Sequence, residues 1–179
     1  MQSSKEIVRA HACCPGSFDP PTNGHLDIIE RAAAIFPLVT VAVVVNPQKR
    51  DPFFSLDERE AMLRACVAAH SNVRVSHFRG LLADFVVQEK IDVIVKGLRV
   101  VSDFENEMAF AHMNRSLADV DTMFLMSDAG YSFLSSSLIK EVFLQGGDVT
   151  AFVPANVLAL MQAKHRPIGG THVDLPRHR

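Results

Sequence analysis

The sequence has little of the patterns that mark secreted and membrane proteins. It contains 3 cysteines in 179 residues, and two of them, Cys13 and Cys14, are adjacent. Three cysteines cannot form a disulfide framework, so we expect reduced thiols and a cytoplasmic protein. The longest apolar run, residues 38–45, is too short to cross a bilayer, and residues 1–6 lack the apolar core of a signal peptide. We therefore expect no membrane partner.

The sequence also has no excess of charge of one sign. Its 18 lysines and arginines stand against 20 aspartates and glutamates, which gives a net charge of -2. A protein that binds nucleic acid by neutralising many phosphates needs a basic surplus, so we expect no nucleic acid partner. With 48% hydrophobic and 21% charged residues, the composition is that of a globular core and not of a disordered chain.

What the sequence does contain is a regular alternation of β-branched apolar segments with amphipathic ones. The pattern predicts strands over 7–14, 38–45, 72–78, 91–95 and 122–126. It predicts helices over 25–36, 55–69, 81–89, 102–118, 135–144 and 154–163. This alternation is typical of an α/β fold, a doubly wound five-stranded parallel sheet with helices on both faces. Because the sequence has no internal repeat and no low-complexity linker, we expect one domain over 1–179. We expect its tails, residues 1–6 and 166–179, to be loosely ordered.

Two further patterns favour structural roles. The apolar residues Met108, Phe110, Met113 and Leu117 have helical spacing, which predicts a core-facing stripe on the helix over 102–118. Cys13 and Cys14 have no second ligand pair at zinc spacing, so we expect the first strand to bury them.

The polar and glycine-containing connections fall on one rim of the predicted sheet. They are residues 15–25, 46–50, 96–99 and 127–137, and each follows a strand. The connections on the opposite rim are shorter and have fewer glycines and basic residues. Because ligands of such sheets bind outside the carboxyl ends of the strands, this asymmetry predicts a single anion-binding site.

The first of these connections leads into a helix at His25. Gly16 and Gly24 allow close approach of the backbone to a ligand, and free N–H groups at a helix start favour phosphate. The alternative is that His25 only caps the helix. The loop matches neither a Walker A sequence nor G-x-G-x-x-G. The sequence therefore argues against P-loop hydrolysis and against ordinary NAD binding.

Basic and hydroxyl side chains follow the later strands. Lys49, Lys96 and Arg99 are candidate phosphate clamps, although any one of them alone could be a solvated surface charge. Residues 135–137 are three serines at a helix start, where they can cap the helix, hold phosphate oxygens, or both.

These segments resemble known signatures. Pro15-Gly-Ser-Phe-Asp-Pro with Thr22-Asn-Gly-His25, and Ser135-Ser-Ser-Leu-Ile-Lys140, resemble the two signatures of the nucleotidylyltransferase superfamily. The block from Lys96 to Glu105, followed by Glu107 and residues 112–114, is similar to the bacterial phosphopantetheine adenylyltransferase family. The similarity extends over about residues 9–163.

The resemblance implies a Rossmann-like fold and Mg²⁺-dependent transfer of AMP from ATP to 4′-phosphopantetheine. The products would be dephospho-CoA and pyrophosphate. It also implies a homohexamer and feedback inhibition by CoA.

The resemblance also implies roles for individual residues. His25 matches the family's transition-state stabiliser, and Lys49 and Arg99 are the other implied catalytic residues. ATP would contact Ser17, Phe18, His25, Gly97, Leu98, Arg99, Glu107, Tyr131, Ser132, Phe133, Leu134, Ser135, Ser136 and Ser137. The acceptor would contact Ser17, Lys49, Leu82 and Lys96, with Leu82 as part of an apolar wall. Position 96 is lysine where many relatives have arginine, and Ser17 replaces the commoner threonine.

Two other functions remain open at this point. The same chemistry could serve another acceptor, such as nicotinamide mononucleotide or a cytidylyl-transfer substrate. A non-catalytic adenine-nucleotide sensor would need the glycine-containing rim but not His25, Lys49 and Lys96 together.

Overall fold

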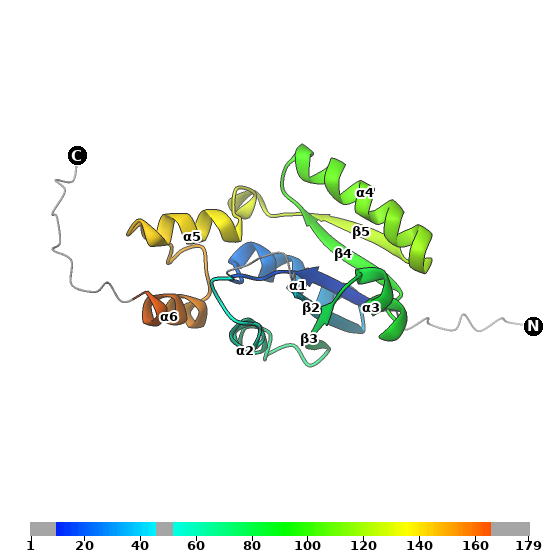
Figure 1. The fold of residues 1–179 in the computed structure, drawn as a ribbon, viewed down its shortest axis with the longest axis horizontal. Helices are drawn as coiled ribbons and strands as arrows, with labels where there is room; N and C mark the ends of the chain where they lie inside the picture. Colours follow the sequence, from blue (N-terminus) through cyan, green and yellow to red (C-terminus); the bar gives the residue numbers. More distant parts are fainter. Residues whose placement is uncertain (1–9, 46–51, 166–179) are drawn as a thin grey trace, which may run out of the picture.

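The computed structural model describes residues 10–45 and 52–165, and it contains one five-stranded sheet (Figure 1). The strands are β1 (His11–Gly16), β2 (Leu38–Val45), β3 (Val73–Arg79), β4 (Val93–Leu98) and β5 (Asp121–Met126). They lie in the order β3-β2-β1-β4-β5, and every neighbouring pair is parallel. The predicted parallel α/β fold is therefore confirmed.

Four helices cover the two faces of this sheet, namely α1 (Asn23–Ile35), α2 (Leu56–Cys66), α3 (Leu82–Gln88) and α4 (Val101–Ala118). The short 3₁₀ helix η1 (Ala129–Tyr131), α5 (Ser136–Leu144) and α6 (Ala155–Lys164) follow the last strand. Helices α1 and α2 contribute to a core on one face, whereas α3 packs on the other. Helix α4 lies on the opposite side of the sheet from α2, and α5 and α6 lie beyond one end of the sheet (Figure 1). None of the helices in the described ranges combines the length and apolar character that a membrane crossing requires.

The buried residues form three clusters. The cluster beneath α1 and α2 includes Ile29, Val41 and Leu63, and the cluster beneath α3 includes Phe85 and Ile94. A third cluster joins α5 and α6 to α2 and contains Phe54, Ile139, Val157 and Met161. The third cluster fixes α5 against the rest of the molecule, and the serine run lies at the start of α5.

Cys13 and Cys14 are buried in β1, as the sequence predicts. Burial raises the pKa of the Cys14 thiol to about 12, because removal from water disfavours the thiolate. The thiol therefore stays protonated at neutral pH and acts as an apolar core group.

The predicted boundaries differ from the structure at two positions that matter for the site. Strand β4 continues to Leu98, so Lys96 and Gly97 pair with β5 as strand residues and do not lie in a loop. Helix α1 begins at Asn23, two residues before the prediction, because Thr22 is its N-cap. Residues 7–9 of the predicted first strand, and Lys49, lie outside the described residues.

The predicted core stripe on the helix over 102–118 is wrong. Phe110, Met113 and Leu117 of α4 are 65%, 57% and 55% exposed, and Met108 is 40% exposed. Helix α4 packs against α3, β4 and β5 through its other side. Because apolar residues occur around most of its circumference, helical spacing alone did not identify the side that faces the sheet.

Candidate functional site

A pocket of about 320 Å³ lies at the carboxyl ends of β1 and β4. The chain moves outward from β1 to β2 and β3, and then returns to place β4 on the other side of β1. The connections after β1 and β4 therefore diverge at this point, and open α/β sheets bind ligands at such a crevice. The pocket also takes residues from α1, α4, η1 and α5, which are far apart in sequence.

Most residues predicted for the site do line this one pocket. They are Ser17, Phe18, His25, Lys96, Gly97, Arg99, Glu107, Tyr131, Leu134, Ser135, Ser136 and Ser137. The structure thus brings together the first loop, the end of β4 and the serine run, as predicted for segments that follow strands on the same rim of the sheet.

Four other predicted residues do not line the pocket. Leu82 is partly buried at the start of α3 and packs against the cluster that contains Phe85, and its predicted contact with the acceptor stays a prediction. Leu98 is buried, Phe133 is exposed with its ring edge against Phe152, and the Ser132 hydroxyl donates to the Ala129 carbonyl.

Two glycines allow the first loop and α1 to pack closely around the pocket. A Cβ atom at Gly16 would lie 2.9 Å from the ring of Phe18, and that ring meets His25 edge-on at 5.1 Å between centroids. A Cβ atom at Gly97 would lie 2.8 Å from Ile28 of α1. A side chain at either position would displace a group that supports His25 or its helix.

His25 both caps α1 and keeps a donor for the pocket. Its Nδ1 accepts a hydrogen bond from the Thr22 backbone N–H at 3.0 Å, while the Thr22 hydroxyl accepts from the His25 backbone N–H. An Nδ1 that accepts carries no proton, so in the neutral ring the proton is on Nε2. The capping alternative and the ligand-binding one are therefore compatible, because they use different nitrogens.

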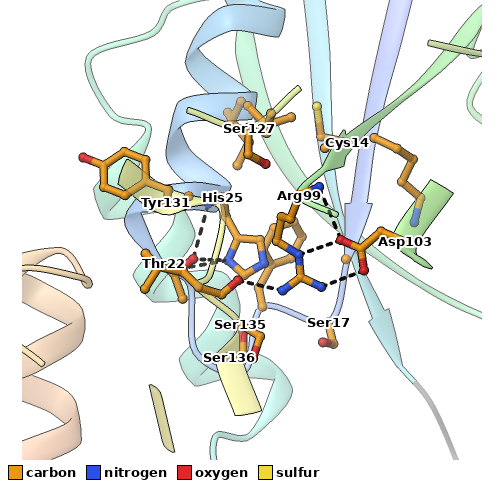
Figure 2. A pocket seen from close by; sticks show the side chains of 18 of the residues that line it. Cys14, Ser17, Thr22, His25, Arg99, Asp103, Ser127, Tyr131, Ser135 and Ser136 are labelled. Atoms are coloured by element: carbon orange, nitrogen blue, oxygen red, sulfur yellow. Dashed lines mark hydrogen bonds and ion pairs between the residues drawn. The ribbon is translucent and has the colours of Figure 1, made fainter. Parts of the chain in front are cut away.

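The charge state of His25 follows from its surroundings. Burial is the larger cause and the nearby Arg99 guanidinium the smaller one, and together they lower the pKa of His25 to about 4. The imidazole is then neutral at pH 7, and it can donate a hydrogen bond but is not an imidazolium. Figure 2 shows the ring between Thr22 and Arg99, close to Ser135 and Ser136.

Arg99 is held in a fixed orientation by two partners. Its Nε and Nη2 donate to the two carboxylate oxygens of Asp103 at 2.8 and 3.0 Å, and its Nη1 donates to the Leu134 carbonyl at 2.6 Å (Figure 2). Hydrogen bonds from Arg99 hold the pKa of Asp103 below its usual value. A guanidinium fixed on two sides presents its remaining N–H groups in one direction, which suits recognition of phosphate.

The other two bases of the pocket are also paired with carboxylates. Lys96 lies 3.1 Å from a carboxylate oxygen of Glu107, and Lys140 lies 3.0 Å from a carboxylate oxygen of Asp19. Each acidic residue that lines the pocket in the described part of the chain is therefore already neutralised by a base. Three preformed ion pairs therefore line this pocket.

Three residues that line the pocket, Thr22, Asp103 and Lys140, received no role from the sequence, although all three lie within the segments that resemble family signatures. Two of them carried a local signal, because Thr22 precedes His25 by three residues and Asp103 follows Arg99 by four. The partnership of Lys140 with Asp19 spans 121 residues, and only the folded chain shows it.

Comparison of the sequence with known proteins identifies relatives over most of the chain. A family model described as cytidylyltransferase-like matches residues 13–142. A phosphopantetheine adenylyltransferase of Streptomyces coelicolor is 51% identical over 155 residues, which cover 87% of this chain and 97% of that protein. Proteins of the same name from Heliobacterium modesticaldum and Corynebacterium diphtheriae are 53% and 50% identical, over 86% of this chain in both cases and 92% and 96% of their own lengths. This chain is a member of the phosphopantetheine adenylyltransferase family.

Proposed function

We propose that this chain transfers AMP from ATP to 4′-phosphopantetheine and releases dephospho-CoA and pyrophosphate. The observation that carries the proposal is the convergence of His25, Lys96, Arg99 and the serine run on one pocket at the strand-order reversal. The names of the relatives, each half or more identical over most of the chain, support the same reaction.

The reaction needs no general base. The attacking group is a phosphate that is already anionic at neutral pH, and it displaces pyrophosphate in line at the α-phosphorus of ATP. The neutral His25, with a pKa near 4, suits a hydrogen-bond donor to oxygens on which charge builds up. Holding two bound reactants in line can contribute about 7–11 kcal/mol, and the cations offset the repulsion between two polyanions.

Magnesium enters this proposal as part of the substrate. The described residues contain no cluster of three or more His, Cys, Asp or Glu side chains that could hold a metal ion. Asp19, Asp103 and Glu107, the carboxylates that line the pocket, are each engaged by a base. These residues do not fit a protein-held Mg²⁺, so we propose that the ion is bound by the phosphates of ATP.

The proposal extends to regulation and location. CoA contains the same adenylate and pantetheine parts as the product, so we propose that it inhibits by competing for this pocket. The reduced cysteines support a cytoplasmic enzyme.

One assay tests the proposed reaction and its alternatives. Purified protein is mixed with ATP, Mg²⁺ and, in parallel, 4′-phosphopantetheine, nicotinamide mononucleotide or no acceptor, and pyrophosphate release is followed. We expect pyrophosphate release only in the mixture that contains 4′-phosphopantetheine as the acceptor. Release with another acceptor would identify a different transferase, and ATP binding without release in any mixture would identify a nucleotide sensor.

Replacing Lys96 with alanine should raise the KM for 4′-phosphopantetheine about 10- to 100-fold, with little change in kcat. A hydrogen-bonded cation that grips the acceptor phosphate acts before the transition state as well as in it, so its loss weakens binding in both. Steady-state kinetics with each substrate varied in turn measures the split. A rise confined to the KM for ATP would mean that Lys96 serves the nucleotide instead.

We also propose that the exposed apolar face of α4 is covered by second copies of this chain, in a homohexamer. Phe110, Met113 and Leu117 form a stripe along this helix, with Met126 of β5 exposed as well. Large exposed apolar patches are rare on monomers and mark interaction surfaces. The family resemblance supports the number six.

Placing a charge on this face should dissociate the oligomer. In light scattering, Phe110→Glu should lower the mass from that of a hexamer to that of a smaller species. Ile35→Glu is the matched control, because Ile35 is an exposed apolar residue on α1 and should leave the mass unchanged. A hexamer that survives Phe110→Glu would show that the interface lies elsewhere.

A further inference from the structure

Asp19 lies beside the pocket but has a different environment from the other acidic residues there. It is 2% exposed, and it occupies the loop between β1 and α1, two residues after Ser17. Asp103 and Glu107 each pair with a base that is predicted to grip a substrate. The Asp19 carboxylate instead accepts hydrogen bonds from donors in two segments that are distant in sequence.

The contacts of Asp19 join three parts of the chain. Its Oδ1 accepts from the Phe54 backbone N–H at 2.8 Å, and its Oδ2 accepts from the Phe53 backbone N–H at 3.0 Å. The same Oδ2 accepts from Lys140 Nζ at 3.0 Å. One buried carboxylate thus ties the first loop to the segment that enters α2 and to the first turns of α5.

A second contact repeats the link between the first loop and α5. The Ser136 hydroxyl donates to the carbonyl of Pro20, the next residue after Asp19, at 2.7 Å. The loop leads directly into Thr22 and His25, while α5 begins with the serine run. The separation between His25 and the serines is therefore set by Asp19–Lys140 and Pro20–Ser136 together.

Such a separation matters for transfer between two bound reactants. Small misplacements of reacting groups can cost large factors in rate even where each reactant still binds. A buried carboxylate with three donors is a rigid connection, since loss of any partner would leave a polar group unpaired away from water.

From these contacts we infer that Asp19 is a positioning residue, which fixes the spacing between the His25 loop, the Phe53–Phe54 segment and α5 for in-line transfer. The inference rests on the proposed function, because it concerns the alignment of two substrates. Lys140 completes the connection through its ion pair and holds α5 to the loop.

The test is the pair of variants Asp19→Asn and Lys140→Met. We expect kcat to fall about tenfold in each, while the dissociation constants for ATP and for 4′-phosphopantetheine, measured separately by calorimetry, stay within about threefold. If both side chains act through the same connection, the double variant should lose little more than the worse single variant.

Glu60→Gln and Arg64→Met are the matched controls. Glu60 is another mostly covered carboxylate in an ion pair, here with Arg64 of the same helix, and neither lines the pocket. Both control variants should keep kcat within about twofold. Calorimetric ATP stoichiometry gives the folded fraction in every variant, so a loss of folded protein cannot pass for a loss of kcat.

Three outcomes would overturn the inference. They are an unchanged kcat in Lys140→Met, additive losses in the double variant, or a loss of binding equal to the loss of kcat. If Asp19→Asn does not fold, the Lys140→Met variant decides the question. The Lys140 side chain is partly exposed, and its replacement leaves in place both hydrogen bonds that Asp19 accepts from the backbone. Absence of pyrophosphate release in the unmodified protein would instead reject the proposed function, while the two affinities would remain measurable.

Discussion

Replacing His25 with alanine should lower kcat by about 10²–10³-fold and change the affinity for ATP little. The Nε2–H is the donor that the pocket keeps once Nδ1 has accepted from Thr22. A donor aimed at charge that develops in the transition state acts mainly on kcat, and loss of one such group costs about 2.7–4 kcal/mol. Steady-state kinetics of pyrophosphate release, with ATP binding measured by calorimetry, separates the two effects.

The capping role of His25 needs its own control. Alanine at position 25 also removes the acceptor for the Thr22 N–H, which loosens the start of α1. Thr22→Ala removes the other half of the same capping box, and it should cost about 1 kcal/mol of stability with kcat within a few-fold of normal. If Thr22→Ala lost as much kcat as His25→Ala, the effect would come from the cap and the donor role would be rejected.

The sheet and the position of the site could be predicted from the sequence because both depend on local patterns. Continuous β-branched runs such as residues 38–45 identify buried parallel strands. In a parallel sheet, every connection that follows a strand emerges on the same rim, so chain order alone groups residues 15–25, 96–99 and 127–137. No long-range contact has to be known for this step.

What the sequence could not show depends on long-range partners. The end of β4 was placed too early because a lysine after an apolar run resembles a loop, whereas pairing with β5 continues through Lys96 to Leu98. The apolar stripe of α4 was assigned to the core because the spacing identifies a face but not what covers it. The ion pair between Asp19 and Lys140 joins residues 121 positions apart and has no local pattern.

Replacing Arg99 with methionine should lower kcat/KM for ATP about 100-fold and should also change the titration of His25. The substitution removes a guanidinium that is fixed by Asp103 and the Leu134 carbonyl, and hydrogen bonds to charged groups are worth about 1.5–3 kcal/mol. It also removes a positive charge that disfavours protonation of His25. We therefore expect the pKa of His25 to rise from about 4 toward its ordinary value, although burial still holds it below that value.

Nitrogen-detected NMR of labelled histidines measures this change directly. In the unmodified protein without substrates, His25 should show an unprotonated Nδ1 at pH 7 and should bind a proton only near pH 4. The unfolded chain binds that proton near pH 6.5, so the folded state loses stability as the pH falls between these two values. In Arg99→Met the midpoint should move up and this acid loss should shrink.

Arg99→Lys separates the charge of Arg99 from its geometry. Lysine keeps a positive charge near His25, so the His25 midpoint should stay close to 4, but it lacks the planar fork that meets both oxygens of Asp103. We expect this variant to keep the titration and still lose most of the activity. If Arg99→Lys restored full kcat/KM, charge alone would account for the role of Arg99, and the paired hydrogen bonds to Asp103 would matter only for stability.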